Sequence, residues 1–188
     1  MRLTNKPMNT SQQVKIIFWL FVIITIVELI NLFTGRMLNQ LGNIPRYIPG
    51  LKGIVLGPFI HGSLQHYFSN IIPICIFSYL LLQYGLKRYV MVSLWVVLGT
   101  GILVWLFGRA SSHIGVSGVI YGYFGYLVLA GFLSGKVKLM LISVLVAFFY
   151  GGLIWGVLPS SPYVSWESHL FGFLTGLAAA KLWATKTN

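Results

Sequence analysis

Residues 115–133 read GVSGVIYGYFGYLVLAGFL, an apolar run without a charged side chain. Gly118, Gly122 and Gly125 follow one another at spacings of four and three residues, so they share one face of a helix. Small residues in this pattern let the backbones of two membrane helices approach closely. The stretch therefore predicts a membrane helix that begins at Ser117 and packs tightly against a neighbour. At about 25 Å it is shorter than the hydrocarbon core, so we expect Ser117 below the membrane surface.

The composition extends this prediction to the whole chain of 188 residues. Apolar residues make up 57% and charged residues only 8%, against roughly a quarter charged in a typical soluble domain. The acids are Glu28 and Glu167, and the single cysteine is Cys75. These numbers are too small for a water-soluble surface, a carboxylate metal site, an internal disulfide or a multi-cysteine zinc site. We expect an integral membrane protein without a cofactor or a metal.

Six apolar runs punctuated by Gly, Pro, Lys and Arg predict the architecture. A membrane helix needs about 20 residues, with a range of roughly 17–25, and all six runs fall within that range. The sequence therefore predicts an all-α bundle of six transmembrane helices in one domain, residues 1–188, with spans at about 16–33, 64–84, 89–108, 117–133, 137–157 and 167–184. Between the first two spans, residues 34–62 form a long apolar segment with three prolines, which we expect to be a loop embedded in the membrane interface.

The basic residues indicate orientation rather than nucleic-acid binding. The net charge is +11, but the lysines and arginines are scattered between apolar runs instead of being gathered on one face. With six spans, nine of them lie on the side of the termini and four on the other side. Because basic residues concentrate in cytoplasmic segments, both termini are predicted to be cytoplasmic.

Five polar side chains stand near the non-cytoplasmic ends of three predicted spans. Polar groups in membrane helices are expensive to bury and are functional candidates by default. They are His66, Asn70, Ser117, Tyr121 and His169. Their shared depth in the predicted topology indicates one site.

The last span has small residues that match those of 117–133. Ser168, Gly172, Gly176 and Ala180 recur every four residues. If the two helices pack along these stripes, Ser117 and His169 meet at the outer end of the seam. Tyr121, one turn after Ser117, is then expected to stack on the His169 ring.

A serine and a histidine in reach of each other permit nucleophilic hydrolysis. The histidine takes the proton of the serine hydroxyl, and donors must stabilise the oxyanion that follows. The Ser117 amide, at a helix start, can donate, as can His66 and Asn70. We expect Gly115 to let the substrate approach the backbone. Glu167 is two residues from His169 and points elsewhere, so a dyad is predicted rather than a triad.

These residues resemble the rhomboid family of intramembrane serine proteases, and within it the short six-helix GlpG type. The similarity rests on the run Gly115–Gly118, on His169 with Gly172 and Gly176, and on the sequence HGSLQH at 61–66 followed by Asn70. It implies that Ser117 is the nucleophile and His169 the base, with His66, Asn70 and the Ser117 amide as the oxyanion hole. The implied substrates are transmembrane helices cut in or near the bilayer beside small residues.

The chain departs from the family pattern at two places. Lys52 and Gly53 stand where the family often has Trp-Arg, and Pro73 lies inside the helix that carries His66. Two other functions remain open: a catalytically silent rhomboid-like chaperone, and the six-helix substrate-binding subunit of a vitamin transporter. The expected partners are substrate helices and the lipid bilayer, the expected location is a bacterial inner membrane, and the oligomeric state is open. Residues 158–166 are predicted to form a mobile lid.

Overall fold

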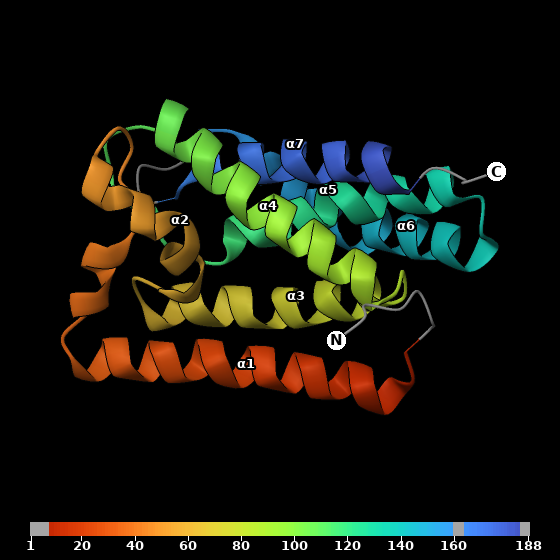
Figure 1. The fold of residues 1–188 in the computed structure, drawn as a ribbon, viewed down its shortest axis with the longest axis horizontal. Helices are drawn as coiled ribbons and strands as arrows, with labels where there is room; N and C mark the ends of the chain where they lie inside the picture. The colour runs from red at the N-terminus through yellow and green to blue at the C-terminus, as the bar shows by residue number, and fades with distance from the viewer. Residues whose placement is uncertain (1–7, 160–163, 185–188) are drawn as a thin grey trace.

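The computed structural model describes residues 8–159 and 164–184, and in this part of the chain every regular element is helical. The all-α prediction is confirmed. Successive long helices run in alternating directions, so that α1 begins and α7 ends at the same end of the bundle (Figure 1). The long helices are α1 (Thr10–Phe33), α3 (Leu64–Leu82), α4 (Leu86–Phe107), α5 (Ser117–Ser134), α6 (Val137–Tyr150) and α7 (Trp166–Trp183).

Four of the described helical segments are long and apolar enough to cross a membrane. These are α1, α4, α5 and the segment Val137–Val157. The helices α3 and α7 have similar lengths, 19 and 18 residues, but are not among these four segments. An integral membrane protein is therefore supported, whereas six spans remain a prediction.

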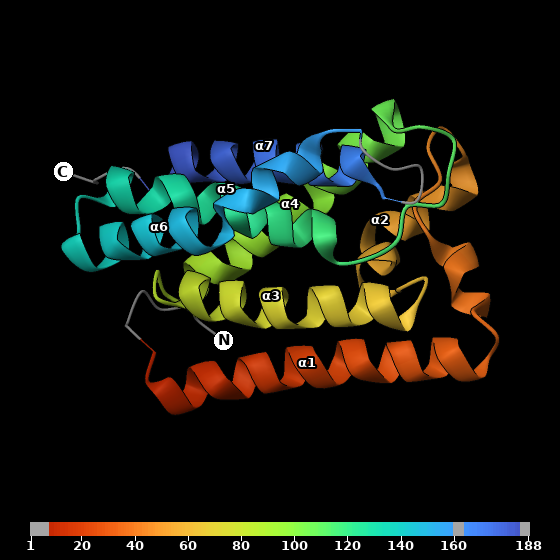
Figure 2. The same ribbon diagram turned by 180° about the vertical axis from the view of Figure 1, so that it is seen from behind.

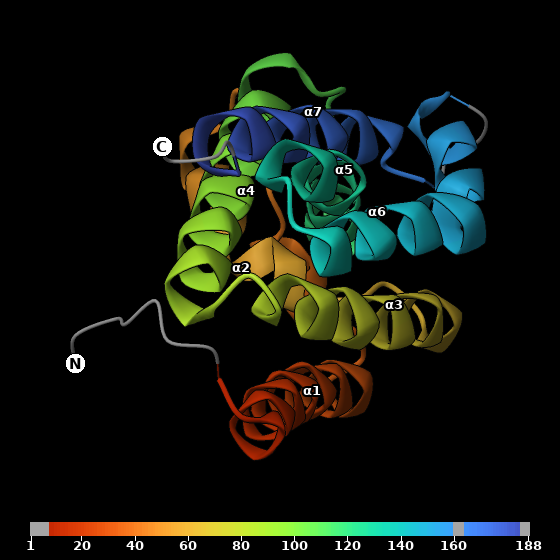
Figure 3. The same ribbon diagram turned by 90° about the vertical axis from the view of Figure 1, so that its right-hand side faces the viewer.

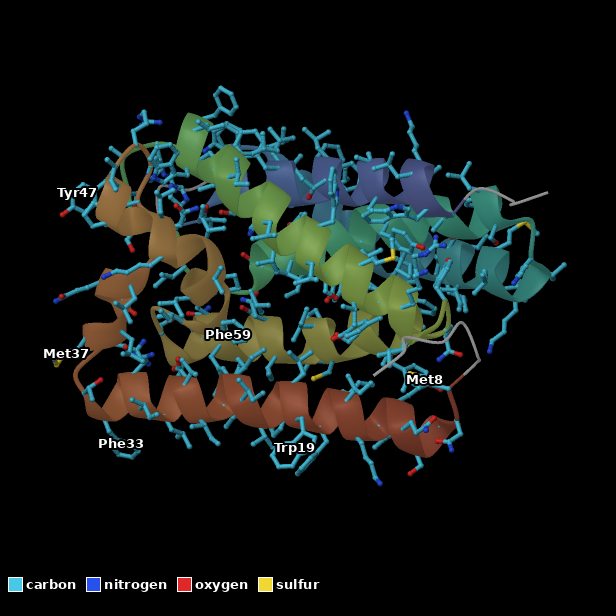
Figure 4. The ribbon with its side chains drawn as sticks, viewed as in Figure 1. Met8, Trp19, Phe33, Met37, Tyr47 and Phe59 are labelled. Carbon is cyan, nitrogen blue, oxygen red and sulfur yellow. The ribbon has the colours of Figure 1, made fainter. Side chains whose placement is uncertain are left out.

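The outer faces of the bundle are rich in large apolar side chains, as a lipid-facing surface requires. On α1, Trp19 is 60% exposed and Phe33 is 83% exposed. Both side chains project away from the other helices (Figure 4). Met37 and Tyr47 lie at the outer edge of the segment between α1 and α3 (Figure 4) and are also more than half exposed.

The helix α5 is the centre of the bundle, and α1 is its periphery. Viewed along the helices, α1 lies beyond α3 on the side away from α5 and α7 (Figure 3). Most of α5 is buried, including Tyr126 and Leu127, which are fully enclosed. The start of α5 is therefore fixed by neighbours on several sides.

The predicted small-residue seam between α5 and α7 is confirmed. A Cβ at Gly172 would overlap the carbonyl oxygen of Gly118, and a Cβ at Gly176 would overlap that of Gly122. Glycine is needed at these positions because the two backbones are in direct contact. These contacts fix the position of α7 along the axis of α5, so that the first turns of the two helices lie side by side.

Segment 34–62, expected to be a long loop, is folded into short helical turns at one end of the bundle (Figure 1). They are η1 (Met37–Leu41), η2 (Ile48–Lys52), α2 (Gly53–Leu56) and η3 (Gly57–Phe59). Pro49 and Pro58 lie in the first turns of η2 and η3, where a missing N–H costs nothing. Gly53 touches the backbone of Gly42 and Asn43 so closely that a Cβ would overlap them.

The predicted span 137–157 is one of the four candidate membrane spans among the described residues, but its last third is not α-helical. The α-helix ends at Tyr150, and the chain continues as the 3-10 helix η4 (Gly151–Val157). The paired glycines Gly151 and Gly152 have weak helix propensity and explain the change. By contrast, α3 continues through Pro73. The predicted lid at 158–166 includes residues 160–163, which lie outside the described residues.

Candidate active site

His169 occupies the first turn of α7 and is almost fully buried. Its Nδ1 lies 2.9 Å from the carbonyl oxygen of Gly156 in η4. Because a carbonyl oxygen can only accept, Nδ1 carries the ring proton in this bond. The lone pair of neutral His169 is then on Nε2. A histidine in this tautomer can accept a proton through Nε2.

The Tyr121 ring lies flat against the His169 ring. The ring centroids are 4.1 Å apart and the planes differ by 7°, so the expected stack is present. Gly156 contacts the Tyr121 ring from η4, which packs against α7 (Figure 2). A Cβ at Gly156 would overlap the Tyr121 hydroxyl. Sequence reasoning missed Gly156, because its contribution is a backbone carbonyl and an absent side chain.

Ser117 is the first residue of α5 and is partly exposed. It lies one turn before Tyr121, and a Cβ at its neighbour Gly118 would lie 3.3 Å from the carbonyl oxygen of Ser168. Ser117 and His169 are thus at the same level of the seam. Among the described residues, Ser117 Oγ makes no hydrogen bond to His169. The proton-transfer contact of the predicted dyad is therefore not formed in this structure.

The first two amides of α5 are free to bind an anion. The helix begins without a side-chain cap at Val116. The intrahelical bonding starts with Val119 and Ile120, whose amides donate to the Val116 carbonyl. Within the described chain, the amides of Ser117 and Gly118 donate to nothing, which is the usual state of a helix N-terminus. These two N–H groups lie next to the Ser117 hydroxyl.

His66 reaches the start of α5 from α3. Its ring packs against Gly115, where a Cβ would lie 2.5 Å from Cε1 of His66. Gly115 also has φ +107°, a conformation that favours glycine. The His66 ring fills the space beside Gly115, so the room expected there for a substrate is not open in this structure. The ring nitrogens of His66 make no hydrogen bond to any described residue.

Asn70 lies one turn after His66, but its amide is turned toward its own helix. Its Nδ2 donates to the His66 carbonyl oxygen at 2.7 Å and to Ser69 Oγ at 3.2 Å. Both amide hydrogens are used in α3. Asn70 must turn away from these acceptors before it can donate to an oxyanion.

Glu167 does not complete a triad. Its Oε1 accepts from the Arg109 amide at 3.3 Å and lies 3.6 Å from Arg109 Nε. Arg109 in turn donates to the Val164 carbonyl at 2.6 Å. The carboxylate ties the loop before α5 to the start of α7 and makes no described hydrogen bond to His169.

A small cavity lies behind the seam, lined in part by Gly115, Gly118 and Ser168. Its volume is about 40 Å³, which is room for a few water molecules. Asn43 and His113 line it from the loops, and Asn43 Oδ1 is buried without a described partner. The cavity thus adjoins Gly118 and Ser168, the residues that flank Ser117 and His169.

His113, which is not among the residues expected in the site, is tied to that cavity. Its Nε2 donates to the Arg109 carbonyl at 3.0 Å, and its Nδ1 accepts from Ser165 Oγ at 2.5 Å. Ser165 and Ser168 are joined through their hydroxyls at 2.6 Å. Burial lowers the pKa of His113. The neutral ring therefore bridges the loop before α5 and the start of α7.

No cluster of three or more metal-ligating side chains occurs in the part of the chain that the structure describes.

The fold and the glycine seam define a helical membrane protein whose polar residues gather where α3, α5 and α7 begin. The Rhomboid domain matches residues 49–186, which include all of these helices. The chain belongs to the rhomboid family.

Its curated relatives are mycobacterial. Proteins called uncharacterized from Mycobacterium bovis and Mycobacterium tuberculosis are each 34% identical over 168 residues, covering 84% of this chain and 69% of the relative. One from Mycobacterium leprae is 34% identical over 166 residues, covering 84% of this chain and 66% of the relative. The match extends beyond the site to most of this chain.

Proposed function

We propose that this protein is an intramembrane serine endopeptidase in which Ser117 is the nucleophile and His169 the general base. Nε2 of His169 takes the proton of the Ser117 hydroxyl as Oγ attacks the scissile carbonyl. The protonated ring then gives that proton to the leaving amine. Water then hydrolyses the acyl-enzyme: His169 takes a proton from the attacking water and gives it to Ser117 Oγ as the acyl group leaves.

The observation that carries the proposal is the hydrogen bond from His169 Nδ1 to the Gly156 carbonyl. In serine hydrolases with a triad, an acid fixes the base in the tautomer that leaves Nε2 free. Here a backbone carbonyl does the same, and the Tyr121 stack fixes the ring plane. A dyad therefore needs no carboxylate, in agreement with the engagement of Glu167 by Arg109.

The oxyanion hole of the proposal consists of the Ser117 amide, His66 and Asn70. The amide is at a helix N-terminus, where the dipole favours a negative charge. His66 can donate through a ring N–H that is not engaged by the described residues. Asn70 joins after its side chain rotates away from the His66 carbonyl.

The proposed setting is a bacterial inner membrane crossed six times, with both termini in the cytoplasm. The charge distribution supports this orientation, and the helix directions agree with an even number of passes (Figure 1). The site then lies near the outer side of the membrane. Its substrates would be transmembrane helices, cut toward their outer ends at small residues that lower the cost of unwinding. Within the family, we assign the chain to the short GlpG type.

Labelling with a fluorophosphonate tests the proposal directly. We expect mass spectrometry to find the phosphonyl group on Ser117 of the full chain in detergent, and Ser117→Ala to abolish it. His169→Ala should slow labelling strongly because the hydroxyl loses its base. An unlabelled Ser117 in folded protein would instead favour a catalytically silent rhomboid-like chaperone, the alternative that family membership leaves open.

A further inference from the structure

Each of the two acidic residues forms an ion pair with an arginine from a segment that connects two long helices. Glu167 holds Arg109, and Glu28 in α1 holds Arg36 just beyond the end of α1. Glu28 is 2% exposed, and its Oε1 lies 2.7 Å from Arg36 Nη1. Burying such a pair brings little net stability, so stability alone does not explain its presence in a peripheral helix.

The Arg36 guanidinium reaches past Glu28 to the segment that precedes α3. The same Nη1 donates to the His61 carbonyl oxygen at 2.9 Å. Asn31, fully buried in α1, donates to that oxygen from its Nδ2 at 3.0 Å. Arg36 adopts φ +67°, an unfavourable conformation for a residue with a side chain. Two side chains at the end of α1, Asn31 and Arg36, therefore donate to one backbone oxygen, and Glu28 pairs with the Arg36 guanidinium.

The anchored residue, His61, contacts His66 through its ring. The two rings meet edge to face with centroids 5.0 Å apart. His61 is fully buried, and neither of its ring nitrogens has a partner among the described residues. Its ring therefore acts by packing and not by hydrogen bonding.

His66 is consequently held between two surfaces. His61 lies on one side, and the bare backbone of Gly115 lies on another. Since no described hydrogen bond orients the His66 ring, packing alone sets its direction. A displacement of His61 would move the ring relative to the Ser117 amide.

We propose that Glu28, Asn31 and Arg36, here called the α1 clamp, are positioning residues that hold His66 in the oxyanion hole through His61. This inference rests on the proposed function. It assigns α1, which is remote from the seam (Figure 3), a part in the reaction. The clamp residues touch neither the substrate nor the reacting atoms.

A double-mutant cycle separates positioning from simple stabilisation. Arg36→Gln is combined with His66→Ala, and both the cleavage rate and the fluorophosphonate labelling rate of Ser117 are measured. We expect Arg36→Gln to lower both rates about tenfold when His66 is present and less than about twofold in the His66→Ala background. The change in melting temperature should be the same in both backgrounds. Equal losses of rate in the two backgrounds would overturn the proposal.

Arg46→Gln is the matched control. Arg46 also has a positive φ, +58°, and donates to backbone carbonyls, those of Leu106 and Gly108, at the other side of the segment. Any loss caused by Arg46→Gln should be independent of His66. If the rate loss of Arg46→Gln depends on His66 as strongly as that of Arg36→Gln, the dependence is a general effect of loosening segment 34–62. The positioning role of the α1 clamp would then be refuted.

Two further variants cover the case in which Arg36→Gln does not fold. Arg36→Lys keeps the charge opposite Glu28. Asn31→Ala leaves the ion pair intact and removes the bond to His61 together with the Asn31 bonds to Leu38 and Asn39. Each should show the same coupling to His66 at a smaller amplitude, and additive losses in both would overturn the proposal. If Ser117 of the unaltered protein is not labelled at all, the proposed function fails and the clamp fails with it, whereas a labelled protein with additive losses refutes the clamp alone.

Discussion

The His169 imidazole is held on two sides, by the Gly156 carbonyl at Nδ1 and by the Tyr121 ring across its face. Gly156 belongs to η4, which continues α6, whereas Tyr121 belongs to α5. The orientation of the base therefore depends on where the 3-10 segment lies against α5. A displacement of η4 would release the Nδ1 proton from its acceptor.

This contact predicts a mutation and its rescue. Gly156→Ala places a methyl group on the Tyr121 hydroxyl, so η4 must move and the base loses its orientation. We expect cleavage to fall about 100-fold, as for a displacement of roughly 1 Å in a catalytic group. Tyr121→Phe keeps the stack and removes the hydroxyl, so the double variant should recover much of the activity. Cleavage assays on the three variants check this, and a double variant no better than Gly156→Ala would contradict it.

Ser117 and His169 should be equally indispensable. Ser117→Ala and His169→Ala are each expected to lower cleavage of a model transmembrane substrate by about 10⁴-fold or more while leaving the fold intact. Because both residues act in one covalent mechanism, the double variant should be no worse than either single one. Single-variant rates in detergent or liposomes test this, with melting curves as the control for folding. Substantial cleavage by either variant would remove the dyad.

His66 and Asn70 should differ in their effects. His66→Ala removes a free donor, and we expect kcat to fall roughly tenfold to 100-fold, less than the largest losses known for an oxyanion donor, because the Ser117 amide remains. Asn70→Ala also breaks the bond to the His66 carbonyl, so it should lower both kcat and the melting temperature. If Asn70→Ala changes only the melting temperature, Asn70 serves the packing of α3 and not the reaction.

Local sequence patterns were enough to predict several features of the fold. Apolar run lengths identified the long helices, and the spacing of Gly118, Gly122, Gly172 and Gly176 identified the seam because helical periodicity places these glycines on facing stripes. The stack of Tyr121 on His169 could be predicted because the matching small residues place the first turns of the two helices side by side.

The missed features depend on long-range backbone contacts. Gly156 acts through its carbonyl, and no residue type signals that. The α1 clamp joins Glu28 to His61 through a left-handed residue, Arg36, whose conformation the sequence does not announce. Gly151 and Gly152 did carry a signal for the change from α-helix to 3-10 helix, since paired glycines weaken a helix.

The seam predicts a sharp difference between glycines. Gly172→Ala puts a methyl group into the Gly118 carbonyl, whereas Gly151→Ala meets nothing within 4 Å. We expect Gly172→Ala to destabilise the protein by about 1–3 kcal/mol, the usual cost of overpacking, and Gly151→Ala to leave stability unchanged or slightly higher. Thermal unfolding of both variants in the same detergent measures the difference. Equal melting temperatures would show that the two helices are not in backbone contact.

The last prediction concerns pH and His61. Burial, with smaller contributions from the neighbouring His66 and the Arg36 charge, lowers the pKa of His61 from 6.5 to about 3. The unfolded chain therefore binds a proton between these values that the folded chain does not. The contribution of neutral His61 to the free energy of unfolding is fully present above pH 6.5 and falls as the pH drops toward 3, by about 1.4 kcal/mol for each pH unit.

His61→Phe keeps an aromatic edge against His66 but cannot be protonated, so the fall in melting temperature between about pH 7 and about pH 4.5 should become smaller. Part of the fall should persist, because burial also lowers the pKa of His113. An unchanged acid dependence in His61→Phe would mean that His61 is not the buried neutral ring on which the α1 clamp relies.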